Sequence, residues 1–530
     1  MGIGFYLFLM RVIYIILCCF LYYNNSIAQI TTFNKRVQLG CGNTILTSLE
    51  VTDSCYYVTG IARDSLSCNL GALFTKYDTT GNLSLYKIYE NIESWNPSLR
   101  TDYDGSLIVS MYSIDTTAFR GGVLKYDVNG DTLWSKYFYN PYIIGNFFRP
   151  DDVIATEDSS YIMVVTVSEP EESGEMNIIK IDKNKNIEWQ IYRNDTITAE
   201  RLGCIYESKK DKGIIIGYMQ DDLISGTQLN YKIRSKLEKI DSLGNTVWTY
   251  ESPSNEQIHG VNDLIQSKDK GLVVASAYGS ERLNPTGTYA VPIQEAYVYK
   301  LDSGRNFLWG TKFHSDALTS ANFQKVIELE DSSLVAFGTV VRLYPPSNPT
   351  YNIVHGRIVK LSPQGDSIWS RDYEYLSTAN ASHKVYDAER THDGGFLICG
   401  EANGVDTMPS NPIIFQQGWL IKLDEEGCLV PGCHITTGIL PIEQRASISL
   451  SLYPNPTVDY LNVHYYNKET KENLTFSVVD LQGRVLSSYE TYDQSDKTYI
   501  VPVSDLVVGM YVLEVRQEGV LVGSEQFVKQ

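Results

Sequence analysis

A short motif that recurs seven times along the chain is the feature that most limits its fold. The motif is Φ-Lys-Φ-Asp-x-x-Gly-x-x-x-Trp, where Φ is usually apolar, and its copies lie 49 to 62 residues apart. The lysines of the seven copies are Lys76, Lys125, Lys180, Lys239, Lys300, Lys360 and Lys422. Units of this length cannot bury an apolar face alone, so they stack into an array in which neighbours share a core.

Each unit is predicted to contain four strands. An apolar strand precedes each motif and is entered through an acidic or glycine turn, as in residues 211–219 and 269–278. Another short strand lies further upstream, as in residues 261–266. Four antiparallel strands per unit are typical of a β-propeller blade. The sequence therefore predicts an all-β chain with a seven-bladed β-propeller over residues 29–433. A linear β-solenoid is the alternative, but its coils are usually shorter than these units.

The tryptophans mark one equivalent position of the repeat. They are Trp134, Trp189, Trp248, Trp309 and Trp369, which make up five of the seven tryptophans in the chain. A large aromatic ring at a repeated position is most simply a packing anchor between neighbouring blades. We therefore interpret these tryptophans as structural.

The seventh unit lacks its Trp strand, because a Cys-Leu-Val-Pro-Gly-Cys segment follows Gly427. Residues 32–39 lie directly before the first unit, where a Trp strand would be expected. We expect this segment to close the ring by pairing with residues 419–423, since an open sheet edge is prone to aggregation.

The last part of the chain, residues 449–530, is predicted to be a separate small β domain. Leu461, Val463 and Tyr465 alternate with polar residues, as do Tyr511, Leu513 and Val515. This period of two is typical of half-buried strands. About seven short strands in this length predict an Ig-like β-sandwich, joined to the propeller by a linker over residues 434–448.

This segment also carries an ordered set of landmarks. They are Tyr453, Pro454, Asn455, Pro456, Asp480, Gly483, Arg484, Leu506, Gly509, Tyr511, Phe527 and Lys529. In this order and at the chain end, they resemble the type A C-terminal sorting domain of the type IX secretion system. The resemblance implies a cargo of Bacteroidota-type bacteria that crosses the outer membrane and is either released or anchored at the cell surface. It also implies the secretion machinery as a partner.

The beginning of the chain agrees with export. Arg11 precedes an apolar run over residues 12–21. Small residues follow this run, and the last of them is Ala28. This arrangement predicts a signal peptide over residues 1–28 and a mature protein that begins at Gln29. Translation starts at Met1 or Met10. A retained membrane anchor is the alternative, although the run is short for a bilayer span. No other segment approaches eighteen consecutive apolar residues, so we expect the mature protein to be soluble.

The charge of the chain excludes some partners. Residues 1–28 contain one arginine and no acidic residue, so 43 basic and 63 acidic residues give the mature chain a net charge of −20. Such a surface repels nucleic acid and anionic lipid. We expect the mature protein to be a monomer.

Residues that suggest chemistry are few. No metal-ligand spacing, nucleophile elbow or phosphate-binding loop is present, so we predict no cofactor, metal or catalytic residue. His383, Asp387, Glu389 and His392 cluster in sequence, and we interpret them as a solvated turn. Asp127, Asn129 and Asp131 resemble half of a calcium loop. At the position of Asn129 the third unit keeps a possible ligand, Asn184, but the fourth and fifth units have Leu243 and Gly304, which favours a plain hairpin.

Cysteine use fits an oxidising exterior. Seven cysteines follow the predicted signal peptide, an odd number, so at least one thiol has no partner within the chain. Cys428 and Cys433 flank a Pro-Gly turn that can bring them into bonding range. We predict a disulfide between them.

The loops remain as candidates for binding. Those between the second and third strands of units five to seven are predicted to be long, over residues 279–295, 342–356 and 402–418. They carry Tyr289, Tyr344, Tyr351 and Phe415 among Pro, Asn and Gly. Aromatic side chains beside amide groups suit glycans or extended peptides.

The sequence favours a non-catalytic surface or secreted module that captures a glycan or a protein. The alternative is a secreted polysaccharide-degrading hydrolase or lyase, with acidic residues from several blades gathered in the central channel. Carboxyl groups that converge in the channel with raised pKa values would favour this alternative.

Overall fold

The computed structural model describes 22 segments of the chain, and they contain strands but no helix. The described residues are 31–64, 70–90, 92–93, 98–114, 119–138, 147–168, 175–193, 198–208, 213–223, 231–253, 258–283, 290–313, 321–344, 351–376, 378–404, 416–431, 433, 448–467, 473–480, 484–492, 497–517 and 520–530. None of these segments forms a helix that could cross a membrane. The predicted signal peptide, with Ala28 and Gln29, lies outside the described residues.

Four-stranded antiparallel sheets repeat along the first 430 residues, as the motif predicts. The first unit contains β2 (Thr44–Val51), β3 (Cys55–Arg63), β4 (Leu70–Asp78) and β5 (Leu83–Glu90). The second contains β6 (Ile92–Glu93), β7 (Leu99–Thr101), β8 (Leu107–Ile114), β9 (Phe119–Tyr126) and β10 (Thr132–Phe138). The short strands β6 and β7 both pair with β8 and together take the place of one inner strand. The third contains β11 (Phe147–Ala155), β12 (Tyr161–Ser168), β13 (Glu175–Ile181) and β14 (Ile187–Arg193).

The later units repeat this order. The fourth contains β15 (Thr198–Glu207), β16 (Ile214–Leu223), β17 (Tyr231–Ile240) and β18 (Thr246–Glu251). The fifth contains β19 (Ile258–Gln266), β20 (Leu272–Leu283), β21 (Ala290–Leu301) and β22 (Phe307–Phe313). The sixth contains β23 (Asn322–Glu328), β24 (Leu334–Tyr344), β25 (Tyr351–Leu361) and β26 (Ser367–Tyr373). The seventh contains β27 (Ser382–Arg390), β28 (Phe396–Asn403), β29 (Gln417–Leu423) and, from the start of the chain, β1 (Phe33–Val37).

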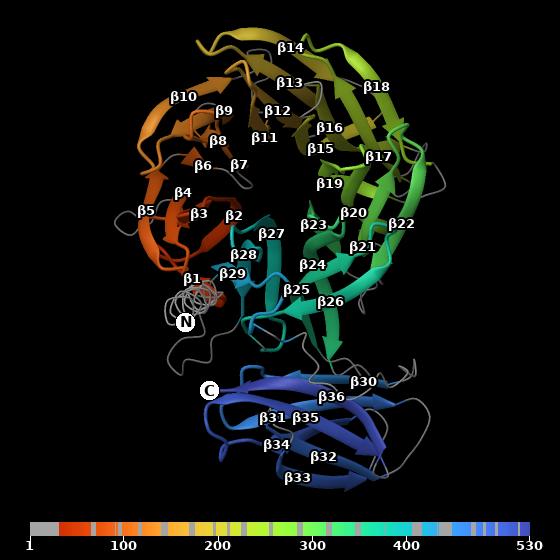
Figure 1. Cartoon of the computed structure of the whole chain (residues 1–530). Coiled ribbons are helices and arrows are strands. Elements are labelled where there is room, and N and C mark those ends of the chain that lie inside the picture. Colours follow the sequence, from red (N-terminus) through yellow and green to blue (C-terminus); the bar gives the residue numbers. More distant parts are fainter. Residues whose placement is uncertain are drawn as a thin grey trace, which may run out of the picture.

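The units stand around a common axis, with β2, β7, β11, β15, β19, β23 and β27 nearest to it (Figure 1). Burial follows this arrangement. Every residue of β3 except the last is buried, because middle strands are covered by neighbouring units on both faces. Outer strands such as β22 alternate between exposed and half-buried residues. The architecture is that of a β-propeller.

Strand β1 closes the ring. It pairs with β29 in antiparallel register, from Phe33 opposite Lys422 to Val37 opposite Gly418. The predicted closure is therefore confirmed. Phe33 lies opposite the repeat lysine, which is the position that Trp309 and Trp369 occupy in their units. The aromatic anchor of the seventh unit is thus supplied by the other end of the array.

The repeat lysine and the acidic turn form one ion pair. Lys180 Nζ lies 2.9 Å from Asp158 Oδ2, and Lys422 Nζ lies 2.9 Å from both carboxylate oxygens of Asp393. Lys125 is buried and contacts the carboxylates of both Asp102 and Asp104. Because these three lysines are buried in the sheet, the aspartate is the partner that each charge requires. This pairing explains why the two sequence features recur together.

The tryptophans pack against the next unit. Trp189 Nε1 donates to the carbonyl of Ser242 at 3.0 Å, and Trp309 Nε1 donates to the carbonyl of Pro363 at 3.2 Å. The ring of Trp369 lies against Gly427, where an added Cβ would come within 2.6 Å of the ring. Gly427 also has a φ of +70°, which favours glycine. The tryptophans are inter-unit anchors, as the sequence predicts.

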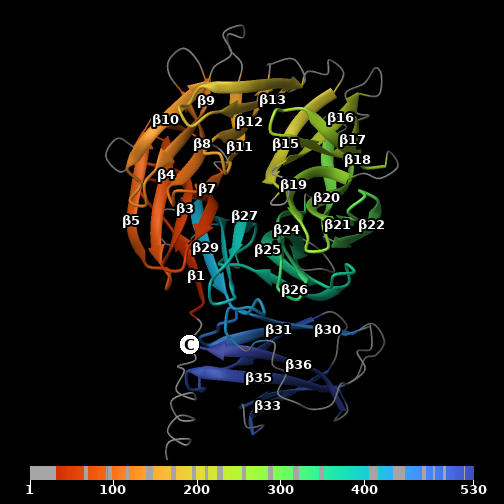
Figure 2. The same ribbon diagram turned by 45° about the horizontal axis from the view of Figure 1, so that its top comes forward.

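The C-terminal part is a sandwich of two sheets. One sheet contains β30 (Ile448–Tyr453), β31 (Tyr460–Asn467) and β34 (Lys497–Pro502). The other contains β33 (Val485–Tyr492), β32 (Asn473–Val479), β35 (Gly509–Gln517) and β36 (Val520–Lys529). Leu461, Phe476 and Leu513 belong to the core between them. Figures 1 and 2 both show this sandwich outside the ring, next to β26.

Candidate functional site

The inner strands place one side chain from every unit at the same level of the channel. In each unit this residue lies two positions before the one aligned with the repeat lysine. The residues at this level are Ser48, Ser98, Asp152, Cys204, Asp263, Lys325 and Asp387. In six of the seven units a register shift directly precedes the residue. Such bulges re-aim side chains, and here they do so at equivalent points around the ring.

The aspartates at this level join neighbouring units. Asp152 Oδ2 accepts a hydrogen bond from the backbone N–H of Ile205 at 3.1 Å. Asp263 Oδ2 accepts one from Val326 N at 3.0 Å, and Asp387 Oδ2 accepts one from Leu49 N at 3.1 Å. In each case the donor lies on the inner strand of the next unit. The carboxylates are therefore held firmly in place.

Further charged groups complete the cluster. Lys325 Nζ lies 3.2 Å from Asp387 Oδ1, and one Nη of Arg100 lies 3.4 Å from Asp152 Oδ2. Two residues beyond the level of Asp387, Glu389 Oε2 accepts a hydrogen bond from Val51 N at 2.8 Å.

Glu50 Oε2 accepts a hydrogen bond from the Thr101 hydroxyl at 2.6 Å. Five carboxyl groups and two cations thus come from the inner strands of six units. They are Glu50, Asp152, Asp263, Asp387, Glu389, Arg100 and Lys325.

The carboxyl groups differ in their affinity for protons. Burial raises the pKa of Glu389 well above its usual value, and the neighbouring Glu50 raises it further. Burial also raises the pKa values of Glu50 and Asp263. Burial acts in the same direction on Asp387, but Lys325 and Arg100 outweigh it and lower the pKa of that carboxyl. The cluster therefore combines a carboxyl group whose pKa is lowered, Asp387, with carboxyl groups whose pKa values are raised.

A cavity of about 410 Å³ lies next to this cluster. Its lining comes from strand ends and the turns that follow them in units one, six and seven, and consists of Val51, Thr52, Asp53, Glu330, Arg390, Thr391, His392 and Gly394. His392 Nδ1 lies 3.2 Å from Asp53 Oδ1, and an Nη of Arg390 lies 3.7 Å from Glu330 Oε1. Val51 lines the cavity and also donates to Glu389. The cavity wall and the channel cluster are thus continuous.

The interpretation of residues 383–392 as a solvated turn is wrong for most of them. His383, Asp387 and Glu389 lie in strand β27, and His383 and Asp387 are buried. Only His392 lies in the exposed turn. His383 Nε2 accepts a hydrogen bond from Leu376 N at 3.0 Å, and burial lowers the pKa of this histidine to about 4. Charged residues are compatible with an inner strand because partners from other units meet them there.

The long loops of units five and six are also shorter than predicted. β20 continues to Leu283 and β21 begins at Ala290, so most of residues 279–295 form a hairpin. Tyr344 and Tyr351 lie opposite each other at the end of the β24 and β25 ladder. Pairing continues because it satisfies the backbone groups that a loop would leave to solvent. Tyr289 and Phe415 lie outside the described residues.

A second polar cluster lies beside the β24 and β25 hairpin. His355 Nδ1 lies 3.4 Å from Glu374 Oε2, and Asp372 binds Arg357 at 2.7 Å and Arg342 at 3.1 Å. Burial, followed by the charge of Asp372, raises the pKa of Glu374 to about 7. Burial lowers the pKa of His355 to about 4. At neutral pH this histidine is therefore uncharged.

The hairpin interpretation of residues 127–131 is confirmed. Asp127 lies in the turn between β9 and β10, and its Oδ1 accepts hydrogen bonds from Asn129 N and Asp131 N, both at 2.8 Å. The carboxylate is thus used by the turn. Within the described segments, no three His, Cys, Asp or Glu side chains are arranged so that they could hold a metal ion.

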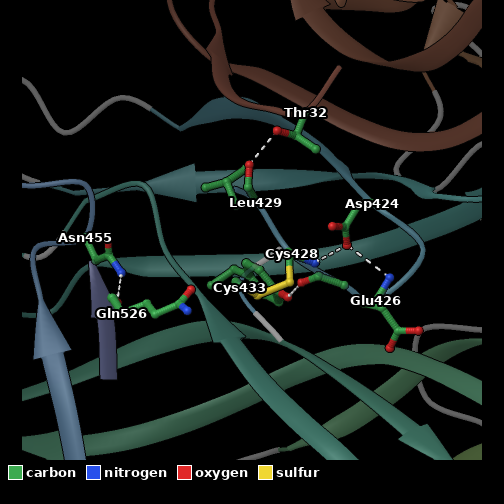
Figure 3. The surroundings of a disulfide bond; sticks show 10 residues. Thr32, Asp424, Glu426, Cys428, Leu429, Cys433, Asn455 and Gln526 are labelled. Atoms are coloured by element: carbon green, nitrogen blue, oxygen red, sulfur yellow. Dashed lines mark hydrogen bonds between the residues drawn. A yellow bond between two sulfur atoms is a disulfide. The ribbon is translucent and has the colours of Figure 1, made fainter. Parts of the chain in front are cut away.

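Cys428 and Cys433 form a disulfide, with their Cα atoms 5.5 Å apart (Figure 3). Cys428 is buried in the turn after β29, and its backbone N–H donates to Asp424 at 2.6 Å. In the same turn Leu429 accepts a hydrogen bond from the Thr32 hydroxyl, directly before β1. The disulfide thus lies at the joint where the ring closes. Cys41 is also disulfide-bonded, and the described free cysteines are Cys55, Cys204 and Cys399, all buried.

Landmark residues of the C-terminal domain hold its last strand, β36, in place through hydrogen bonds and ring stacking. Asn455 Nδ2 donates to the carbonyl of Gln526 at 3.0 Å, and Val528 N donates to Asn455 Oδ1 at 2.9 Å. The rings of Tyr511 and Phe527 stack with centroids 5.7 Å apart.

Three landmarks hold turns of the same domain in place. Asp480 Oδ2 accepts a hydrogen bond from Arg484 Nε at 2.6 Å, and Tyr511 donates to the carbonyl of Val507 at 2.7 Å. Gly483 lies outside the described residues. These landmarks therefore hold the ends of the domain together.

Comparison with solved structures returns distant similarities. A protein of unknown function from Dyadobacter fermentans is 12% identical with a TM-score of 0.40, over 63% of this chain and 96% of that one. The polysaccharide lyase Uly1 is 9% identical with a TM-score of 0.42, over 72% and 90%. A Penicillium chrysogenum α-L-arabinanase is 11% identical with a TM-score of 0.39, over 58% and 92%. Similarity at this level carries no information about activity.

The C-terminal domain gives the informative comparison. No curated protein matches the chain. Residues 451–530 match the family described as the secretion system C-terminal sorting domain, which agrees with the landmarks and with the sandwich that they fasten. These residues therefore belong to the type IX sorting-domain family, and the chain is a secreted cargo of that system, a cell-surface or extracellular protein.

Proposed function

We propose that this cargo carries a non-catalytic binding module, formed by its propeller, that captures a glycan or a protein segment outside the cell. The observation that carries the proposal is the cavity beside the channel cluster, to which three units contribute polar side chains. Ligand sites are concave and contain a few well-placed polar groups. We further propose that residues 29–433 form the module as a monomer, that residues 1–28 are removed, and that residues 434–448 are a linker.

The lining suits a ligand with hydroxyl or amide groups. Asp53 can accept hydrogen bonds and Arg390 can donate them, while the Thr391 hydroxyl, which donates to Asp393, can still accept one. Because the carboxylates of the adjacent channel bind backbone groups of neighbouring units, the walls are held in place before a ligand arrives. A preformed site reduces the entropy lost on binding.

Glycan and peptide arrays probed with the mature protein, residues 29–530, test this proposal. We expect binding without product, and we expect Asp53→Ala combined with His392→Ala to weaken it about tenfold or more. Both side chains are more than three-quarters exposed, so the fold should tolerate the change. Lys183→Ala, on an exposed turn of the third unit, is the matched control. Unchanged affinity in the double variant would contradict this placement of the site.

A hydrolase or lyase acting on polysaccharides is the second candidate, and the channel carboxyls favour it. Burial raises the pKa of Glu389, whereas Lys325 and Arg100 lower the pKa of Asp387, and two carboxyl groups whose pKa values are shifted apart are the kind of pair that can supply an acid and a base. Each glycan that binds is therefore also analysed for shortened products. If products form, Glu389→Gln should abolish them while binding persists. That outcome would replace the non-catalytic proposal.

A further inference from the structure

The sorting domain carries a cluster of exposed apolar side chains at one end. They are Val458 (57% exposed), Tyr460 (52%), Ile500 (67%), Val507 (80%) and Val508 (76%). Val507 and Val508 are the most exposed of the large apolar residues that the structure describes. We call these five residues the apolar end. A soluble protein rarely gathers apolar side chains at its surface without a use for them.

Backbone pairing brings the apolar end together. Tyr460 begins β31 opposite Pro502 of β34, and Ile500 lies two residues before Pro502. Residues two apart on a strand share a face, so Tyr460, Pro502 and Ile500 lie on the same outer face, and all three are exposed. Their strand neighbours Leu461 and Val501 point into the core.

The two valines follow the same strand end. Val503 N donates to the carbonyl of Asp459 at 2.9 Å, and Leu506 N donates to the carbonyl of Val503 at 3.1 Å. The turn after β34 is thus tied to the start of β31. Tyr511 donates to the carbonyl of Val507, which fixes the backbone that presents the valines. The apolar end is therefore built on rigid structure.

We propose that the apolar end is the surface by which the secretion machinery recognises this cargo. The domain belongs to a sorting family, so a protein of the export apparatus must contact it. Asp459 and Asp505 are exposed at the border of the apolar end. The partner that fits is therefore an apolar surface with a basic edge, because apolar contact supplies affinity while opposite charges orient the two proteins.

Export of the full-length chain in a host with this secretion system tests the proposal. Val507→Ser combined with Val508→Ser changes only exposed side chains, so the purified variant should unfold at the wild-type temperature. We expect the ratio of surface and secreted protein to periplasmic protein to fall about tenfold, which corresponds to about 1.4 kcal/mol of lost binding. Wild-type export of this variant would overturn the proposal.

A matched control uses the propeller. Leu133→Ser combined with Val247→Ser removes two apolar side chains that are 54% and 57% exposed on outer strands. We expect export at the wild-type level, and an equal loss would overturn the proposal by showing that any exposed apolar residue matters. Gel filtration of the mature protein tests whether a second copy of this chain, rather than the secretion machinery, binds to the apolar end. A dimer that the valine variant dissociates, with export intact, would also overturn the proposal.

Discussion

One side-chain position on the inner strand has two roles in this ring. Asp152, Asp263 and Asp387 each bind a backbone N–H of the next unit. Their other oxygens remain available to neighbours such as Lys325, which lies 3.2 Å from Asp387 Oδ1. A buried carboxylate requires such partners, since unpaired burial of a charge is costly. The groups that join the units are thus also the groups that give the channel its charge.

No residue type marks this position in the sequence. Its residues are Ser48, Ser98, Asp152, Cys204, Asp263, Lys325 and Asp387, which share no chemical type. Only the strand register aligns them, and in six of the seven units a bulge directly before the residue shifts that register by a residue or more. Counting back from the acidic turn of each unit is the one sequence signal that could have found them.

Glu374 makes stability depend on pH. Its pKa is raised from 4.5 to about 7, so the proton binds more tightly in the folded state. The stability linked to this proton is full below about pH 4.5 and is lost as the pH rises through about 7. Because the side chain is 27% exposed, we expect a loss of about 2 to 3 kcal/mol.

Glu374→Gln, which resembles the protonated form, should therefore be more stable than the wild type at pH 8 and equally stable near pH 4.5. Urea unfolding at both values measures the difference. His355 and His383 are neutral at pH 8 in both proteins, since their pKa values are about 4. Glu425→Gln, at an exposed position, is the matched control and should leave the stability at pH 8 unchanged. Equal stability of the Glu374 variant and the wild type at pH 8 would refute the assignment.

Among the strands, outer hairpins were predictable and inner strands were not. The turn of the outer hairpin is encoded locally, because its aspartate, or Ser362 in the sixth unit, binds backbone groups within four residues, as Asp127 does. The tryptophan and the repeat lysine then recur at fixed distances. Inner strands are specified by contacts with other units, which leave no local pattern. For this reason the sequence wrongly predicted a solvated turn at His383, Asp387 and Glu389.

The position of strand β1 was predictable because the seventh unit lacks an outer strand. The seventh unit has no outer strand of its own, and residues 32–39 were the unassigned strand nearest in the repeat order. The structure adds the detail that Phe33 takes the tryptophan position and lies against Gly81 of the first unit. The same segment thus completes the last unit and packs on the first.

Removing β1 should therefore open the ring. A mature chain that begins at Gly40 loses the ladder with β29, at about 1 kcal/mol per hydrogen bond. It also loses the burial of Phe33 and Leu39, at about 1.5 to 3 kcal/mol each. Such losses approach the whole stability of a typical domain, about 5 to 15 kcal/mol. We expect a lower melting temperature and aggregation through the bare edge of β29.

A chain that begins at Thr32 is the control, since it keeps β1 and should melt like the mature protein. Light scattering and thermal unfolding of the two truncations make the comparison. A monomeric chain beginning at Gly40 with an unchanged melting temperature would show that closure does not depend on β1.

At the scale of the whole molecule, the described cores belong to one part or the other. The sandwich cluster contains only residues from 450 to 527. The clusters of the ring contain only residues from 33 to 429. Since apolar burial is the main stabilising contribution to folding, each part has its own source of stability. Export information is carried by one part and the proposed binding site by the other.

Deletion of residues 449–530 should consequently separate folding from delivery. The ring keeps all of its described core clusters, its closing strand and the Cys428–Cys433 disulfide, so we expect the melting temperature of the propeller to be unchanged. The protein should nevertheless remain in the periplasm, because the sorting domain is gone. Cell fractionation measures its location, and thermal unfolding of the periplasmic protein measures its fold. Normal amounts at the cell surface would contradict the role of the sorting domain, whereas an unfolded periplasmic product would contradict the independence of the two cores.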